Sequence, residues 1–429
     1  MLSAGASARK ESIVERTYES AVAAVGSATG PLSEHLTPFV DSLIRQRYVP
    51  AVVHVKALHA LAFDRWLERQ GIATADVAET HIARFERRRR RGEGRIRPET
   101  KRRERCDVLH VLRFLRAIGA CHDVARVATP ADELAAAYVR YLRQQQGLAA
   151  STIERYGGIA RQFIVQRSSD GDVDLRAARA SDVIEFVRRQ AERLRPPAAK
   201  CVVNAMRSFL RYAQFRGEAA RELVAAVPAV AAWATTPQLP KAIAPEHAQR
   251  AIDSCDLHTA IGLRDRAILL ILARLGLRAH EIIALQLEDC DWERGQLQVR
   301  GKGGRLAVLP MPVDVGQAIA AYLERGRLPT EDRHLFLRST APIRGLQQGG
   351  DGVGSIVRYA LRRAKVEAPH QGSHQFRHAL AVRLLRGGAS LHEIGEVLRH
   401  RSPQSSSIYA RVDLEALRCL ALHWPGGAR

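Results

Sequence analysis

Two successive sets of amphipathic segments constrain the N-terminal half of this 429-residue chain to a helical fold. In each set, apolar residues recur at positions i, i+3, i+4 and i+7, which gives a helix one apolar face. Four such faces can close into a four-helix bundle. The first set is predicted over residues 37–48, 49–69, 75–88 and 99–118, and the second over 131–145, 150–167, 180–194 and 198–216.

The two sets also share a short stretch of similar sequence. Residues 113–116 read RFLR in the last helix of the first set, and residues 208–211 read SFLR in the last helix of the second. The likeness favours a duplicated helical module. The alternative is that a short helical sequence recurs by chance.

A proline-rich stretch separates these bundles from a segment of another kind. Residues 226–244 contain three prolines, which few helices tolerate, and are predicted to be a linker. Beyond it, residues 296–301 and 305–310 alternate around a Lys-Gly-Gly turn, which predicts a β-hairpin among further helices. The expected fold class is therefore mainly α in the N-terminal bundles, followed by an α+β domain with a small β-hairpin sheet.

These patterns predict five parts along the chain. An N-terminal extension is expected over 1–33, a first helical domain over 34–125 and a second over 126–225; the linker covers 226–244, and the α+β domain covers 245–429. Further helices are expected near the end of the chain, over 403–410 and 414–422.

The charge balance points to a polyanionic partner. The formal net charge is +21 and the pI is about 10.5. Such a surplus repels itself unless a polyanion neutralises it, and nucleic acid is the usual partner because each neutralised phosphate releases counterions. A generically basic ribosomal or membrane-surface protein is the alternative.

One basic run is a candidate DNA contact. It lies between the third and fourth helices of the first set, within residues 87–105, where a loop is predicted. Such a run is either a solvated face or a segment laid along a phosphate backbone, and the net charge favours the second. The candidates are Arg87, Arg88, Arg89, Arg90, Arg91, Lys101, Arg102 and Arg103.

Cysteine usage and hydropathy predict a cytoplasmic protein. The six cysteines lie far apart and form no CxxC pair, which favours neither disulfides nor a zinc site. No signal peptide is expected, because Glu11, Glu15 and Glu19 stand where an apolar core would be needed. The longest apolar run, residues 267–273, is too short to span a bilayer, so no membrane partner is expected.

Phosphodiester cleavage without a metal needs three kinds of side chain. A nucleophile attacks phosphorus, fixed cations balance the charge on the non-bridging oxygens, and an acid protonates the departing 5′-oxygen. Arginine suits the cation, because its planar fork binds two phosphate oxygens and stays charged. Tyrosine suits a reversible nucleophile, because phenolate leaves readily when the 5′-hydroxyl returns.

The C-terminal segment supplies these side chains in a fixed order. GLRAHE places a glutamate one turn beyond its arginine, where it can orient the guanidinium, and HQFR places His and Arg on one helical face. A lysine stands at the tip of the predicted hairpin, and a tyrosine stands nine residues past the histidine of LRH. In chain order they are Arg278, Glu281, Lys302, His374, Arg377, His400 and Tyr409.

This order resembles the tyrosine recombinase (phage integrase) family. Any one motif is weak, whereas the whole series is specific. The resemblance covers residues 240–424 closely, and residues 131–225 resemble the core-binding domain of the family. It implies a catalytic α+β domain that cuts and rejoins DNA through a 3′-phosphotyrosyl link, with no metal or high-energy cofactor.

The resemblance also assigns roles. Arg278 and Arg377 look like the two arginines that grip the scissile phosphate, and Glu281 would support them. Lys302 resembles the hairpin lysine that protonates the leaving 5′-oxygen. A turn residue in a glycine-rich hairpin is its alternative, but in a chain with only seven lysines an acid is favoured, since an always-charged arginine is a poor proton donor.

The remaining roles fall to two histidines and the tyrosine. His374 resembles the histidine of proton transfer and phosphate contact, and His400 resembles the second phosphate-binding histidine. Tyr409 resembles the nucleophile, whereas a lone tyrosine near a chain end is ordinarily a surface or core aromatic. His370, His374 and His378 stand four apart, but Pro369 and Gly372 interrupt the helix, so a metal site is not expected.

Two positions depart from the family pattern. Arg399 stands before the second histidine where glycine is common, and it is a further candidate for DNA binding. Residues 405–407 are all serine where threonine is frequent. Neither departure removes a reacting group.

The resemblance implies double-stranded DNA as the partner and a homotetramer on paired sites, with accessory recombinases or DNA-bending proteins as further partners. The chain end resembles integrases and transposases of mobile elements. Two other functions stay open: DNA relaxation by a type IB topoisomerase, and DNA binding by an inactive protein on the same scaffold.

Overall fold

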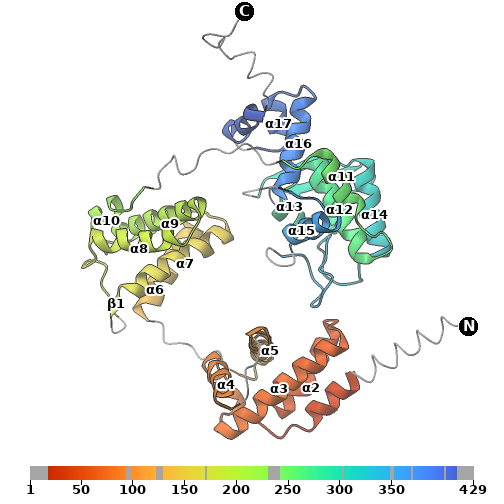
Figure 1. Cartoon of the computed structure of the whole chain (residues 1–429). Coiled ribbons are helices and arrows are strands. Elements are labelled where there is room, and N and C mark those ends of the chain that lie inside the picture. The colour runs from red at the N-terminus through yellow and green to blue at the C-terminus, as the bar shows by residue number, and fades with distance from the viewer. Residues whose placement is uncertain are drawn as a thin grey trace, which may run out of the picture. The chain divides into compact units, whose positions relative to one another are not determined.

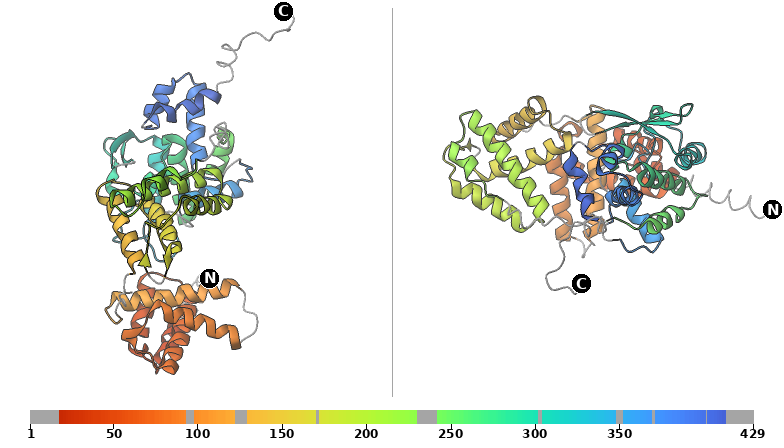
Figure 2. Two further views of the ribbon diagram at one scale, coloured as in Figure 1. Left: turned by 90° about the vertical axis from the view of Figure 1, so that its left-hand side faces the viewer. Right: turned by 90° about the horizontal axis from the view of Figure 1, so that it is seen from above.

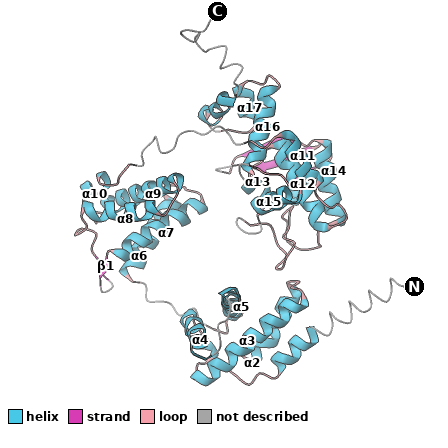
Figure 3. Cartoon of the chain, viewed as in Figure 1, coloured by secondary structure: helices cyan, strands magenta, loops and turns pink. Residues whose placement is uncertain are grey.

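The computed structural model describes residues 18–92, 98–121, 129–169, 172–229, 242–301, 304–347, 352–368, 371–400 and 402–412. Helices predominate among them, as predicted (Figures 1 and 3). The chain divides into two compact units, Met1–Asp123 with Leu239–Arg429, and Val124–Gln238. Within the described residues, no helix is long and apolar enough to cross a membrane.

The first predicted bundle is present. Its helices are α2 (Ser33–Arg45), α3 (Pro50–Gln70), α4 (Glu79–Gly92) and α5 (Pro98–Ala117), with the 3₁₀ turn η1 (Thr74–Asp76) before α4. Helix α2 packs on α3, α3 on α5, and α4 on α5. Proline opens α3, where its missing N–H costs nothing, and the left-handed Gly71 ends it.

The arginine run differs from the prediction. Its described residues are helical where a loop was expected: those up to Gly92 belong to α4, and those from Pro98 onwards belong to α5. The basic residues therefore extend two helices, and arginine is a good helix former, which accounts for the difference. Arg87, Arg102 and Arg103 are exposed. The side chains of the other candidates in this run, Arg88 to Arg91 and Lys101, lie outside the described residues.

The second unit repeats the helix order of the first bundle. Its helices are α6 (Pro130–Gln144), α7 (Ala150–Gln166), α8 (Ala180–Glu192), α9 (Pro196–Phe215) and the short α10 (Arg221–Ala225). Here too the first helix packs on the second, the second on the fourth and the third on the fourth. Leu115 and Leu210 occupy matching positions in the similar RFLR and SFLR stretches, and both are fully buried. The duplication stays a prediction, which this packing order supports.

A small ribbon in this unit was not predicted. Strands β1 (Ser168–Ser169) and β2 (Asp172–Val173) pair antiparallel between α7 and α8. Each has only two residues, too few to show an alternating pattern.

The C-terminal part is built around one buried helix. It contains α11 (Pro245–Asp253), α12 (Ala260–Leu275), α13 (Ala279–Ile283), α14 (Val313–Arg325), α15 (Val353–Arg363), α16 (His374–Arg386) and α17 (Leu391–Val397). Helix α12 is buried on nearly all sides and packs on α11, α14, α15 and α16. Its apolar run is thus a core helix.

The predicted hairpin is present as part of a three-stranded sheet (Figure 2, teal). Strand β4 (Gln296–Arg300) pairs antiparallel with β5 (Leu306–Pro310), and β3 (Cys290–Asp291), which was not predicted, pairs with the other edge of β4. Leu297 and Val299 point into the core, as their alternation with polar residues requires.

The helix predicted over 403–410 is instead two 3₁₀ turns, η4 (Pro403–Ser405) and η5 (Ser407–Val412). Ser402 accepts a hydrogen bond from the Gln404 N–H at 3.3 Å, and the Ser407 hydroxyl donates to the Gln404 carbonyl at 3.0 Å. Such local serine bonds compete with an α-helix. The helix predicted over 414–422 lies outside the described residues.

Candidate active site

Arg377 connects three of the sequence motifs. It lies in the first turn of α16 and is 4% exposed. Its Nη1 donates to the carbonyl of Gly276 at 2.5 Å, and its Nη2 donates to the carbonyl of Leu398. The GLRAHE, HQFR and LRH segments therefore meet at one guanidinium. Burial, and then the charges of Arg278 and Arg399, lower the pKa of Arg377 to about 10, so it remains a cation at neutral pH.

Gly276 makes this junction possible. It ends α12 with φ +59°, a conformation that glycine adopts without strain. A Cβ there would lie 2.9 Å from side-chain atoms of both Leu380 and Leu398. Glycine is thus required at position 276, two residues before Arg278, by the backbone conformation and by close packing.

Arg278 is hydrogen-bonded to Glu281. Its Nη1 donates to Glu281 Oε1 at 2.8 Å, and its backbone N–H donates to Oε2 at 2.9 Å. Burial alone would raise the pKa of Glu281, but the Arg278 backbone N–H and the charges of Arg399 and Arg278 outweigh it and hold the pKa below its ordinary value. The carboxylate is therefore ionised, and it fixes an arginine that is itself only partly buried.

Arg399 joins the same carboxylate. Its Nη2 lies 3.1 Å from Glu281 Oε2, and its backbone is left-handed with φ +54°. That conformation explains why glycine is common at this position in the family that the sequence motifs resemble. The Nε and Nη1 atoms are buried without a hydrogen-bond partner among the described residues. The arginine therefore brings donor capacity to the site in a costly backbone conformation.

Lys302 itself lies outside the described residues, but the residues beside it are placed. The Gly301 N–H donates to the Arg305 carbonyl at 2.7 Å, closing the base of the hairpin. A Cβ added at Gly301 would lie 3.9 Å from Glu281 Oε1. The base of the hairpin is thus next to the carboxylate that orients Arg278.

Tyr409 is buried among the candidate residues. It lies in η5 with 1% of its surface exposed. Burial raises the pKa of its phenol above the ordinary value, although the charges of Arg377 and Arg278 act in the opposite direction. The hydroxyl is therefore protonated at neutral pH, and both predicted phosphate-binding arginines act on it electrostatically.

His400 stacks on Tyr409. The two rings are nearly parallel, with 9° between their planes and 6.4 Å between centroids. The Nδ1 of His400 lies 2.7 Å from the hydroxyl of Ser406, which is itself buried. The serine triplet thus contributes a residue that fixes His400. Burial, followed by the charges of Arg377 and Arg278, lowers the pKa of His400 to about 4, so the ring is neutral at pH 7.

His374 begins α16 and keeps an exposed surface. The protein around it still disfavours the charged ring: partial burial, then the charges of Arg377, Arg278 and His280, lower its pKa. Its ring centroid lies 6.4 Å from that of His378. Across the described parts of the chain, no group of three or more His, Cys, Asp or Glu side chains is arranged to hold a metal ion.

His378 is the residue that the sequence interpretation missed. Its Nδ1 lies 2.9 Å from the hydroxyl of Tyr409, and the two rings meet edge to face with centroids 5.7 Å apart. The available signal was its place one turn after His374, on the same face of α16. That spacing was considered only for a metal site.

The structure brings most of the predicted catalytic residues together. Arg278, Glu281, Arg377, His400 and Tyr409 come together through direct contacts or electrostatic coupling, and Arg399 joins them through Glu281. The described residues of the basic run, Arg87, Arg102 and Arg103, contribute none of these contacts. Arg278 and Arg399 share one buried carboxylate, and Arg377 is coupled to it electrostatically, so positive charge is in excess and suits an anionic ligand such as a phosphodiester.

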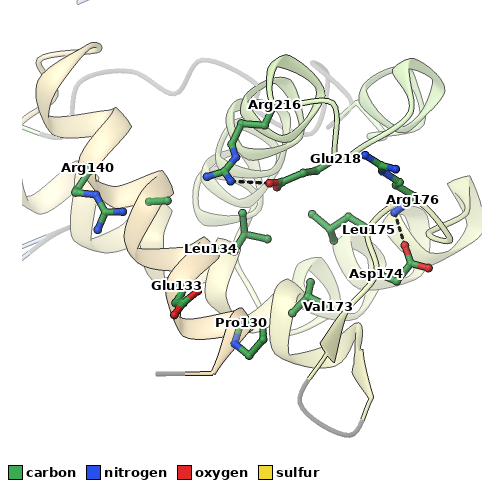
Figure 4. A pocket seen from close by; sticks show the side chains of 11 residues that line it. Pro130, Glu133, Leu134, Arg140, Val173, Asp174, Leu175, Arg176, Arg216 and Glu218 are labelled. Carbon is green, nitrogen blue, oxygen red and sulfur yellow. Dashed lines mark hydrogen bonds and ion pairs between the residues drawn. The ribbon is translucent and has the colours of Figure 1, made fainter. Parts of the chain in front are cut away.

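A separate open pocket lies in the unit Val124–Gln238 (Figure 4). Within its lining, Arg216 forms an ion pair with Glu218 at 2.8 Å, and the backbone N–H of Arg176 donates to Asp174 at 2.9 Å. None of the predicted catalytic residues lines it.

Glu281→Gln tests the arginine arrangement. The variant keeps the shape but removes the only carboxylate bound by Arg278 and Arg399 in the described structure, so we expect the C-terminal part to lose roughly 3 kcal/mol of stability. Calorimetric unfolding measures the loss. Glu288→Gln is the matched control, because its ion pair with Arg333 is exposed, and we expect little change there. Equal effects of the two changes would contradict the arrangement.

Comparison with known proteins now identifies the family. A family model described as the phage integrase family matches residues 241–415. The protein y4rA of Sinorhizobium fredii (strain NBRC 101917 / NGR234), whose name describes it as an integrase/recombinase, is 43% identical over 406 residues, which cover 93% of this chain and 96% of that protein. The chain belongs to the phage integrase family, the tyrosine recombinases. The sequence-based resemblance is confirmed.

Other members of the tyrosine recombinases are similar over about two thirds of the chain. Tyrosine recombinase XerD of Mycobacterium tuberculosis (strain ATCC 25618 / H37Rv) is 30% identical over 294 residues, covering 66% of this chain and 93% of XerD. The XerH site-specific recombinase, solved on a palindromic difH substrate after cleavage, covers 71% of this chain and 99% of its own, at 18% identity and a TM-score of 0.53. That likeness shows a shared fold, and the predicted fold class is confirmed.

Proposed function

We propose that this tyrosine recombinase is a site-specific DNA recombinase or integrase, with Tyr409 as the nucleophile. The observation that carries the proposal is the burial of Tyr409 beside His400 and within the field of Arg278 and Arg377. A core tyrosine without a reactive role would have no need of two arginines nearby. Metal-free phosphoryl transfer needs both the nucleophile and the cations.

In the proposed reaction, each phosphoester bond that forms replaces one that breaks. The Tyr409 oxygen attacks the scissile phosphorus, and the bond to the 5′-oxygen breaks. The DNA then carries a 3′-phosphotyrosyl link, and the 5′-oxygen leaves with a proton from Lys302. Arg278 and Arg377 balance the charge on the non-bridging oxygens, with the neutral His374 and His400 as further phosphate contacts. Attack by a 5′-hydroxyl reverses the steps, so no high-energy cofactor is needed.

The rest of the chain would select and hold the DNA. We propose the catalytic domain over 245–429, the core-binding domain over 126–225 and an additional DNA-binding domain over 34–125, joined by the linker 226–244. The net charge of +21 and the exposed Arg87, Arg102 and Arg103 support backbone contacts to double-stranded DNA. Strand exchange between two duplexes calls for a homotetramer, with accessory recombinases or DNA-bending proteins as further partners.

The proposed setting is the cytoplasm with its nucleoid, and the proposed biological role is integration or transposition of a mobile element. The name of y4rA, an integrase/recombinase, supports this role. A type IB topoisomerase would use similar residues but would relax supercoils without forming junctions. An inactive DNA-binding protein would not need the complete set of reacting groups that this sequence retains.

A nicked suicide substrate tests the nucleophile. The wild-type protein should become covalently attached to DNA carrying its site, because the short 5′ fragment diffuses away and prevents religation. Tyr409→Phe should bind the same DNA but form no covalent product, since only the hydroxyl is lost. Denaturing electrophoresis measures the product. Equal trapping by the phenylalanine variant would remove Tyr409 from the nucleophile role.

A sulfur leaving group tests Lys302. Lys302→Ala should cleave ordinary DNA at least about 100-fold more slowly, because proton donation to the 5′-oxygen is lost. DNA with a 5′-bridging phosphorothiolate should restore the rate, because a thiolate leaves without a proton. Single-turnover cleavage measures both rates, and Lys365→Ala serves as the control lysine. Failure of the sulfur substrate to rescue would exclude Lys302 as the acid.

A further inference from the structure

The attacking hydroxyl of Tyr409 must lose a proton, and its surroundings limit where that proton can go. Burial leaves the phenol 1% exposed and protonated at neutral pH. Bulk water is therefore a poor acceptor, and a positioned side chain is needed. Lys302, as the proposed acid, serves the leaving oxygen and is unsuited to this step.

We propose that His378 accepts the proton of Tyr409. The inference rests on the proposed function and adds a catalytic residue to it. The Nδ1 of His378 lies 2.9 Å from the Tyr409 oxygen, within the reach of a general base. With the neutral ring protonated at Nε2, the phenol donates to Nδ1. The two rings are also inclined to each other, with 62° between their planes.

The neighbouring His400 is less suited to the task. Its ring stacks parallel to the Tyr409 ring, and its Nδ1 is engaged by the Ser406 hydroxyl at 2.7 Å. It therefore lies against the face of the tyrosine and is held by another partner. His378, in contrast, meets the hydroxyl itself.

The helix holds His378 in place. It follows Arg377 directly on α16, and the Arg377 guanidinium is bound by the carbonyls of Gly276 and Leu398. The anchor that positions the phosphate-binding arginine thus also positions the base. A general base on a rigid element meets the geometric demand of proton transfer.

The proton balance closes around the cycle. As the Tyr409 oxygen bonds to phosphorus, its proton moves to Nδ1 and leaves His378 as an imidazolium. The incoming phosphate brings the negative charge that stabilises this cation among the arginines. During religation the bond to Tyr409 breaks, and the imidazolium returns the proton to the phenol. No oxidant or co-reactant is needed.

His378→Asn separates proton transfer from simple positioning. The amide oxygen of asparagine can accept a hydrogen bond from Tyr409 near the place of Nδ1, but it cannot take up a proton. We expect single-turnover formation of the covalent complex to slow about 100-fold or more. Difluorotyrosine at position 409 has a phenol that ionises more readily. It should therefore raise the cleavage rate of the asparagine variant at least about tenfold.

The controls separate the two proposals. His374→Asn, one turn earlier on α16, should also slow cleavage, but difluorotyrosine should not rescue it. A variant of His378 that cleaves as fast as the wild type, or a slow one without rescue, would overturn the role as base. If the wild type forms no covalent complex, the proposed function fails instead. Should the asparagine variant melt early, His378→Gln, whose amide likewise takes up no proton, gives a second test of rescue by difluorotyrosine.

Discussion

The two hydrogen bonds from the buried Arg377 to backbone carbonyls connect most of the site. A guanidinium that is 4% exposed must be bound on several sides, and the carbonyls of Gly276 and Leu398 meet that need. These bonds join the end of α12, the start of α16 and the end of α17. Arg278 follows Gly276 by two residues, and His400 follows Leu398 by two, so both are placed by the same junction. Arg377, which is expected to bind phosphate, therefore also links three helices of the C-terminal part.

Around that junction, positive charge exceeds negative charge. Arg278 and Arg399 share the carboxylate of Glu281, and Arg377 lies within their electrostatic range. Burial, and after it this excess of positive charge, lowers the pKa values of His374 and His400, so both rings are neutral and the cations are fixed arginines. Such a site is costly without a ligand and gains stability when an anion binds. This is the electrostatic preorganisation that phosphoryl transfer requires.

The order of motifs singled out Arg278, Glu281, Arg377, His400 and Tyr409, which the structure brings together, because each motif has a distinctive spacing. Helix positions followed from apolar periodicity, and α9 (Pro196–Phe215) lies within two residues of its predicted range of 198–216. The carbonyl partners of Arg377 could not be predicted, because backbone groups leave no trace in residue identity. The role of His378 was missed for a related reason: its contact depends on the turn conformation of η5, which local serine bonds set. Short strands such as β3 were missed because two residues carry no period.

The central claim is that Tyr409 becomes covalently attached to a 3′ phosphate of DNA. Tryptic digestion of a trapped complex releases residues 402–411, a peptide that contains four serines besides the tyrosine. After nuclease trimming, tandem mass spectrometry should find one 3′-nucleotide on this peptide, and fragmentation should place it on Tyr409. A nucleotide on a serine, or on a different peptide, would contradict the account.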